Sequence, residues 1–307
     1  MSMKFFLMKA QEKRQKCIAP NTNANYQHLL NSYTTHFSKY FGSEEVPLPL
    51  TRDKCSAFLV AYYEDHPKTT YAYLYQFVAA WRYHIRINKL QNFTFDVEFK
   101  ELLQGLQREL QTERSPYAKK PFTPEILQAL AEIDDSELKY LYKDEIMAFI
   151  TLGYYSFLRS SELLKLKYED FTKITDEEIQ FLIRSSKTDQ IGKGVQMTVH
   201  NTEKGYSPFI FFIPYFEKQK SQHPNQNVFP KAYSFYNIHI KYLLKEAGFD
   251  PTEYATHSMR RGAAHTAAIN KAPLYAIKAM GRWKSDVYTT YTDLSTQEAA
   301  LIIDPMI

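Results

Sequence analysis

Apolar residues recur at three- and four-residue intervals through the first third of the chain, which is the period of an amphipathic helix. This pattern predicts helices over residues 22–41, 51–65, 68–87 and about 96–112. Thr51 can cap the start of the second of these, because its hydroxyl can accept from a free backbone N–H of the first turn. The N-terminal third is therefore predicted to be all-helical.

A change of composition separates this region from the rest. The stretch TERSPYAKKPFTPE, residues 112–125, contains three prolines and several basic residues, as inter-domain segments often do. Its last three residues are a capping Thr, a Pro for the first helical position and a Glu for the first turn. We predict a first domain over residues 1–115, a linker over 116–123 and a second domain over 124–307.

The second domain mixes two periods. Spacings of three and four residues predict helices over residues 124–133, 138–157, 160–166, 234–247, 257–269, 273–280 and 285–292. Between them, residues 178–200 alternate apolar and polar side chains on both sides of a Gly-containing turn, which predicts a β-hairpin. The predicted fold class is mainly α, with an all-helical N-terminal domain joined to a mostly helical domain that contains a small β-sheet.

Composition narrows the class of protein. No apolar run approaches the roughly 20 residues of a membrane span, and the patch Phe5–Met8 is too short for a signal peptide, so a soluble, non-secreted protein is expected. Two cysteines cannot form a disulfide framework, and neither has metal-ligand spacing, so we expect a reducing compartment and no metal. The 24 Tyr and 21 Phe supply much of the apolar volume.

The net charge of the chain is compatible with nucleic-acid binding but does not by itself indicate it. The net charge is +4. Residues 1–115 contain 15 Lys and Arg against 11 Asp and Glu, and the remainder contains 23 of each. The N-terminal part is therefore the more basic.

Separated cationic positions could carry chemistry. Arg159 lies where one apolar helix ends and another begins, and a buried arginine is costly without an anion. The alternative is a structural salt bridge with Glu162 or Asp170. Lys187 lies at the end of the first strand of the predicted hairpin, where a solvated surface lysine is the alternative.

The segment HSMRRGAAHTAAI places a histidine and an arginine at the start of an alanine-rich helix. His257 and Arg260 are three residues apart and share a helical face, where backbone amides favour an anion. The alternative is that His257 is a satisfied polar group beside the cap. Tyr288 and Tyr291 lie near the C-terminal end, where a packing role is the alternative to a nucleophile.

In order along the chain, these segments resemble the motifs of the tyrosine recombinase (phage integrase) family. FLRSSELLKL is similar to that family's G-L-R-x-x-E-L segment, Lys187 matches its hairpin lysine, and HSMRRGAA resembles its H-x-x-R box. MGRWKSDVYTTYTDL resembles its closing segment, in which the nucleophilic tyrosine follows a glycine by ten residues, as Tyr291 follows Gly281. KKPFTPEILQAL and TTYAYLYQFVAAWRYHIRI resemble the entry to its catalytic domain and the third helix of its core-binding (SAM-like) domain. The segments HSMRRGAA and GRWKSD most resemble those of Crypton-type recombinases of eukaryotic mobile elements.

The resemblance implies a site-specific recombinase or transposon integrase that cleaves and rejoins DNA through a 3′-phosphotyrosyl intermediate, without metal, ATP or other cofactor. The implied catalytic residues are Arg159, Lys187, His257, Arg260, Trp283 and Tyr291. The arginines would hold the non-bridging phosphate oxygens, Tyr291 would attack, His257 would handle its proton, and Lys187 would protonate the departing 5′ oxygen.

The chain departs from the family after Gly281. Family members usually carry His or Trp at the next position, which here is Arg282, so either Arg282 or Trp283 fills that role. Glu162 would orient Arg159 or His257. We expect further DNA contacts from basic residues in and around these motifs, namely Arg114, Lys119, Lys120, Arg261 and Lys284.

The implied partners are double-stranded DNA and further copies of the chain. A tetramer on DNA would form through the C-terminal segment, about residues 295–307, whose apolar residues could dock on a neighbouring protomer or pack on their own domain. A eukaryotic mobile-element protein would act in the nucleus, and otherwise the cytoplasm is expected. The alternatives are a type IB topoisomerase-like activity, a domesticated non-catalytic DNA-binding protein and a helical scaffold without a DNA role.

Overall fold

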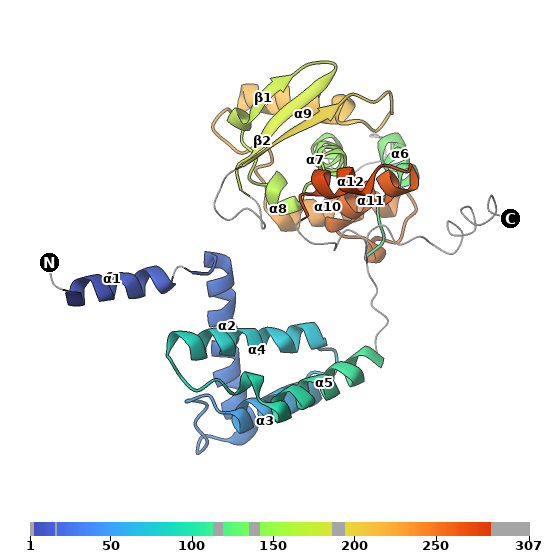
Figure 1. Ribbon diagram of the computed structural model, residues 1–307. Coiled ribbons are helices and arrows are strands. Elements are labelled where there is room, and N and C mark those ends of the chain that lie inside the picture. The colour runs from blue at the N-terminus through green and yellow to red at the C-terminus, as the bar shows by residue number, and fades with distance from the viewer. Residues whose placement is uncertain (1–2, 16, 113–118, 135–141, 186–193, 284–307) are drawn as a thin grey trace. The chain divides into compact units, whose positions relative to one another are not determined.

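The computed structural model describes residues 3–15, 17–112, 119–134, 142–185 and 194–283 (Figure 1). The chain divides into two compact units, Met1–Tyr117 and Ala118–Ile307. The described residues are mostly helical with one small antiparallel sheet, which confirms the predicted fold class. Residues 116–118 of the predicted linker and the helix predicted over 285–292 lie outside the described residues.

The first unit is all-helical. Its elements are α1 (Met3–Gln15), α2 (Pro20–Phe41), α3 (Arg52–Asp65), α4 (Tyr71–Ile87), the 3₁₀ helix η1 (Phe93–Phe95) and α5 (Val97–Thr112). Thr51 caps α3 by accepting from the backbone N–H of Lys54, and Thr70 caps α4 in the same way. The four helices predicted here are confirmed to within a few residues, whereas α1 was not predicted.

Aromatic rings fill the core of this unit. Tyr33 of α2 is fully buried, and its ring meets those of Phe58 and Trp81 edge-on at centroid distances of 4.9 and 5.3 Å. Such edge-to-face contacts suit the charge distribution of aromatic rings. The buried phenol also donates to the carbonyl of Pro47 at 2.9 Å, so its polar end is satisfied. Aromatic packing in this unit thus accounts for part of the abundance of Tyr and Phe.

The second unit has more varied elements. Its helices are α6 (Pro124–Glu132), α7 (Lys143–Tyr155), α8 (Ser160–Leu163), η2 (Tyr168–Asp170), α9 (Pro208–Gln222), α10 (Tyr233–Glu246), η3 (Pro251–Glu253), α11 (His257–Ile269) and α12 (Leu274–Gly281). Its sheet has the antiparallel order β1 (Phe171–Ile174), β2 (Glu178–Ile183), β3 (Val195–His200). The predicted hairpin is confirmed as β2 and β3. Neither the four-residue strand β1 nor α9 was predicted.

Helix α7 is the centre of this unit. It is buried without a break from Ile146 to Tyr154, and α9, α10 and α11 all pack against it (Figure 1). A helix that is apolar on all sides belongs in the interior rather than at the surface. Helix α11, which begins with the predicted His257 and Arg260, and helix α8, which follows Arg159, therefore both pack against one buried helix.

The segment before α6 is attached to α11. Phe122 donates from its backbone N–H to the carbonyl of Ser258 at 3.0 Å, and Lys120 donates to that of Glu253 at 2.8 Å. The helix lies so close that a Cβ on Gly262 would overlap the backbone of Phe122. Glycine at this position is what allows the close approach. The described end of the predicted linker is thus hydrogen-bonded to the second unit.

Candidate active site

Glu162 is the centre of a cluster of arginines. Its side chain is 3% exposed and comes from α8, one turn after Arg159. Its Oε1 accepts from Nη1 of Arg159 at 2.8 Å, while its Oε2 accepts from Nη2 of Arg282 and from the backbone N–H of Arg159, at 2.8 and 2.9 Å. Nη1 of Arg260 lies 3.9 Å from Oε2. Segments more than 100 residues apart in sequence thus meet at one carboxylate.

Electrostatics keeps this carboxylate ionised. Burial alone would raise the pKa of Glu162, but the guanidinium of Arg282, the backbone N–H of Arg159 and the guanidiniums of Arg159 and Arg260 outweigh burial and lower it. Three guanidiniums face one carboxylate, so these four side chains together carry a formal net charge of +2. Such an excess of buried positive charge is favourable only where an anion can approach.

Arg260 is fully buried on α11. Its guanidinium donates to the carbonyl of Phe157 at 2.5 Å and to that of Gly281, and it lies 4.6 Å from the centre of the Trp283 ring. A guanidinium over an indole face is a favourable cation–π arrangement. The indole also occupies the space that a Cβ on Gly281 would need. The Gly281–Trp283 pair therefore supports one face of Arg260.

Arg282 ends α12 in the left-handed conformation, with φ of 54°. Its side chain turns inward, is 7% exposed, and donates to the carbonyls of Met280 and Phe157 at 3.0 and 3.2 Å as well as to Glu162. Of the two residues that could fill the family's His or Trp position, Arg282 binds the carboxylate, whereas Trp283 lies against Arg260. Both belong to the cluster.

His257 begins α11, one turn before Arg260. Its pKa is lowered, first by partial removal of water from the imidazole and then by the positive charges of Arg260, Arg159 and Arg261, with Glu162 acting in the opposite direction. An imidazole with an ordinary pKa of about 6.5 that is shifted downward is neutral at pH 7. His257 can therefore accept a proton there.

One known protein resembles part of this sequence. No protein-family profile matches the chain. The integrase/recombinase XerD homolog of Selenomonas ruminantium is 28% identical over 179 residues, which are 55% of this chain and 52% of that protein, so the match spans about half of the relative's length.

Solved structures match along almost the whole chain. The XerH site-specific recombinase bound to a palindromic difH substrate aligns with a TM-score of 0.65 and 17% identity, covering 97% of this chain and 84% of that one. The Tn1549 transposon integrase with circular intermediate DNA gives 0.58 and 14%, covering 96% and 97%. A lambda integrase dimer bound to a COC′ core site gives 0.57 and 15%, covering 95% and 77%. The chain has the tyrosine recombinase fold. The 28% identity with the XerD homolog agrees with that fold.

Three predicted DNA-contacting residues of this recombinase fold lie beside α11 and have partners within the protein. The ammonium of Lys119 donates to the carbonyl of Thr252 at 2.6 Å, and Lys120 pairs with Glu253 at 2.6 Å. Arg261 donates to the carbonyl of Lys119 at 3.0 Å. Such exposed contacts are weak and can exchange for a phosphate. The predicted residues outside the described part of the chain are Arg114, Lys187, Lys284, Tyr288 and Tyr291.

The first unit of the recombinase fold carries a basic and aromatic surface that the sequence analysis did not single out. A hollow of about 660 Å³ is lined in part by Arg82, Arg86 and Lys89, and none of its described lining residues is acidic. Arg82 also lies over the ring of Phe95, at 5.1 Å. The spacing of the arginines in WRYHIRINK, four residues apart on one helix, was the available signal.

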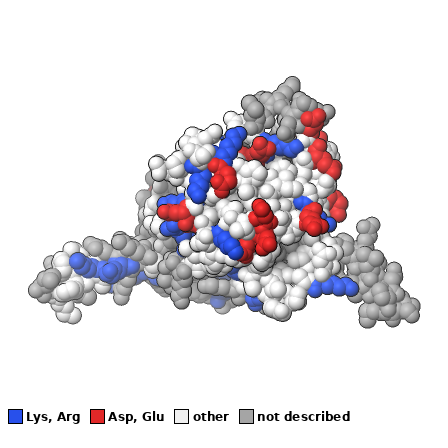
Figure 2. Space-filling view, turned by 90° about the horizontal axis from the view of Figure 1, so that it is seen from above, with Lys and Arg blue, Asp and Glu red and all other residues white. Residues whose placement is uncertain are grey.

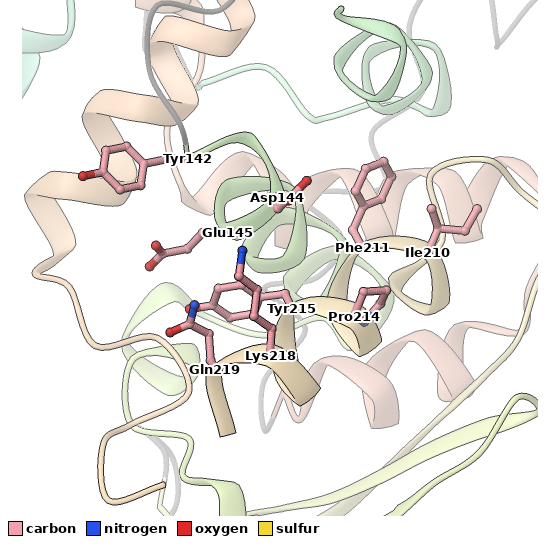
Figure 3. A pocket seen from close by; sticks show the side chains of 9 residues that line it. All are labelled: Tyr142, Asp144, Glu145, Ile210, Phe211, Pro214, Tyr215, Lys218 and Gln219. Carbon is pink, nitrogen blue, oxygen red and sulfur yellow. The ribbon is translucent and has the colours of Figure 1, made fainter. Parts of the chain in front are cut away.

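Other surfaces of the recombinase fold look less suited to an anion. On the face shown in Figure 2, Lys and Arg atoms lie among Asp and Glu atoms rather than in one basic area. A cavity of about 290 Å³ opens between the start of α7 and α9 (Figure 3). Its rim includes the carboxylates of Asp144 and Glu145 and the ammonium of Lys218, and it includes none of the predicted site residues.

Two features are absent from the described part of the chain. None of its helices has the length and apolar character needed to cross a membrane. Within the same residues, no three His, Cys, Asp or Glu side chains are grouped so that they could hold a metal ion.

Proposed function

We propose that this protein is a site-specific DNA recombinase that cleaves and rejoins DNA through a covalent tyrosyl intermediate. The observation that carries the proposal is the buried cluster in which Arg159, Arg260 and Arg282 surround the single carboxylate of Glu162. A pentacoordinate phosphorane bears more negative charge than the phosphodiester from which it forms. A site with preorganised, excess positive charge stabilises that state more than the ground state.

The chemical step needs a nucleophile and two proton transfers. The phenol oxygen of Tyr291 attacks the scissile phosphorus, the bond from phosphorus to the 5′ oxygen breaks, and a 3′-phosphotyrosyl bond forms. His257, neutral at pH 7, takes the phenol proton. Arg159 and Arg260 bind the non-bridging oxygens, and the indole of Trp283 lies beside Arg260 at the same phosphate. Because one ester replaces another, religation requires no ATP.

Lys187 serves as the general acid for the departing 5′ oxygen. Ser185, at the end of the described part of the hairpin, lines the same small cavity as Glu162. Two further residues span at most about 7 Å when fully extended. Lys187 itself lies outside the described residues, and its role as the general acid is what the resemblance implies.

Duplex DNA is the proposed substrate. The XerH, Tn1549 integrase and lambda integrase structures contain DNA, and their fold is shared over 95% or more of this chain. The hollow lined by Arg82, Arg86 and Lys89 adds a basic surface in the first unit. Because such contacts go to phosphates, binding should weaken steeply with salt.

The proposal extends to the subfamily of the enzyme, the compartment in which it acts and its oligomeric state. The motifs HSMRRGAA and GRWKSD support a Crypton-type mobile-element enzyme, which would act in the nucleus. Its working form would be a tetramer on DNA, assembled through residues 295–307. Lys284 and Arg114 would add further phosphate contacts.

A suicide substrate tests the proposal. Binding sites are first enriched from random duplex DNA, and a nick is then placed so that the cleaved end diffuses away. Wild type should leave a detergent-resistant protein–DNA band that Tyr291→Phe lacks and that Tyr288→Phe, the matched control, retains. A band lost in Tyr288→Phe alone would move the nucleophile. Absence of any band with wild type would favour a non-catalytic DNA-binding protein, whereas relaxation of supercoils without strand exchange between two duplexes would favour a topoisomerase.

A further inference from the structure

One carboxylate oxygen of the cluster is shared unequally by two arginines. Oε2 of Glu162 accepts from Nη2 of Arg282 at 2.8 Å, whereas Nη1 of Arg260 stays at 3.9 Å. The first distance is a hydrogen-bonded ion pair and the second is not a hydrogen bond. Arg282 therefore occupies the acceptor that Arg260 would otherwise reach.

Arg282 is held in place by the backbone on both sides of the site. Its guanidinium donates to the carbonyl of Met280 in α12 and to those of Ser156 and Phe157, in the turn that leads to Arg159. It also lies 3.4 Å from the sulfur of Met197 in β3. A planar guanidinium with five donors can satisfy several acceptors at once, which an ammonium cannot. Arg282 thus ties α12, the Arg159 turn and the hairpin together.

We propose that Arg282 is a positioning residue that occupies Glu162 and thereby keeps Arg260 from forming a close ion pair with that carboxylate. This inference rests on the proposed function, because it assigns how the charge of the cluster is divided. Without Arg282, Arg260 could close the remaining gap to Glu162, and a close pair would neutralise charge that the transition state needs. DNA affinity, which many phosphate contacts supply, would change much less.

Arg282 also helps to keep the carboxyl group of Glu162 ionised. Among the charges around this carboxylate, the guanidinium of Arg282 does most to lower its pKa, against the opposing effect of burial. Losing that charge raises the pKa even if Arg260 moves closer, because fewer guanidiniums then face the carboxylate, so protonation of Glu162 begins at a higher pH. An upward shift in the titration of the Glu162 carboxyl itself separates this role from a purely structural one.

The test compares Arg282→Met with wild type and with Arg282→Lys, which keeps the charge. Lys173→Met, which removes a surface cation paired with Glu178 in the same unit, is the control. Single-turnover cleavage should fall about 10- to 100-fold in Arg282→Met, as for misplaced catalytic groups, with DNA affinity within about threefold of wild type. Carbon-13 NMR of the DNA-free protein should show the carboxyl of Glu162 titrating at higher pH, and Arg282→Lys should restore that titration.

Unchanged titration of Glu162 in Arg282→Met, or equal losses of rate and affinity with no rescue by Lys, would overturn the inference. Should Arg282→Met fail to fold, Arg282→Gln, which can still donate to the carbonyls, carries the same expectation. The titration needs no DNA. It therefore tests the pairing of Arg282 with Glu162 even if wild type forms no covalent complex, an outcome that would instead overturn the proposed function.

Discussion

Replacement of Glu162 by glutamine would remove the one carboxylate from the arginine cluster while keeping its size. The side chains of Arg260 and Arg282 are 0% and 7% exposed, so water can do little to replace the lost charge. Removing one partner of a buried ion pair typically costs about 3–5 kcal/mol, because a buried charge is left without compensation. For a unit of this size, each kcal/mol lowers the melting temperature by roughly 2–4 °C, so a loss on the order of 10 °C is expected.

Calorimetry of the full chain at pH 7 measures this loss. Because the two units have separate cores, the transition of the first unit serves as an internal reference. Glu178→Gln is the matched control, since it makes the same exchange in a pair whose lysine, Lys173, is 51% exposed, and it should cost at most about 1 kcal/mol. Sulfate should restore more stability to Glu162→Gln than to wild type, because an anion can replace the missing carboxylate.

The pH dependence has a defined sign. The pKa of Glu162 is lowered in the folded protein, so its contribution to stability is full above the unfolded pKa of about 4.3 and is lost as pH falls through the folded value. The difference between wild type and Glu162→Gln should therefore shrink below about pH 4. Equal melting temperatures at pH 7, or a difference that sulfate does not narrow, would refute the idea that excess buried positive charge defines this site.

Three further predictions concern other parts of the chain. Gly262→Ala should destabilise the second unit by about 1–3 kcal/mol in urea unfolding, because its Cβ meets backbone, whereas Gly105→Ala, with open space around it in α5, should stabilise the first unit by about 0.5–1 kcal/mol. Arg86→Gln should reduce the slope of log affinity against log salt by about 1 in DNA titrations; an unchanged slope would remove Arg86 from the interface. The cleavage rate should fall below pH 6.5, as His257 becomes protonated. Arg261→Gln, which removes a charge that lowers the pKa of His257, should shift this acid limb to higher pH in single-turnover assays; a downward shift would contradict the assignment.

Local patterns in the sequence determined most of the secondary structure and the order of the motifs. The first-unit helices α2 to α5 and the β2–β3 hairpin follow from three-, four- and two-residue periods, which depend only on neighbours along the chain. His257 and Arg260 fall on one helical face for the same reason. Helix α9 escaped prediction because Pro208 and Pro214 suggest breaks, and burial of its aromatic residues against α7 outweighs that preference.

Tertiary structure alone decided how the site is assembled. The pairing of Arg159 with Glu162 was open as a structural salt bridge or part of a catalytic site, and the convergence of Arg260 and Arg282 on the same carboxylate shows that the bridge is itself part of the charged cluster. Neither the inward turn of Arg282 nor the contact of Trp283 with Arg260 follows from spacing. Both arise because α7, α11 and α12 pack together, and such packing brings together residues that no local period relates.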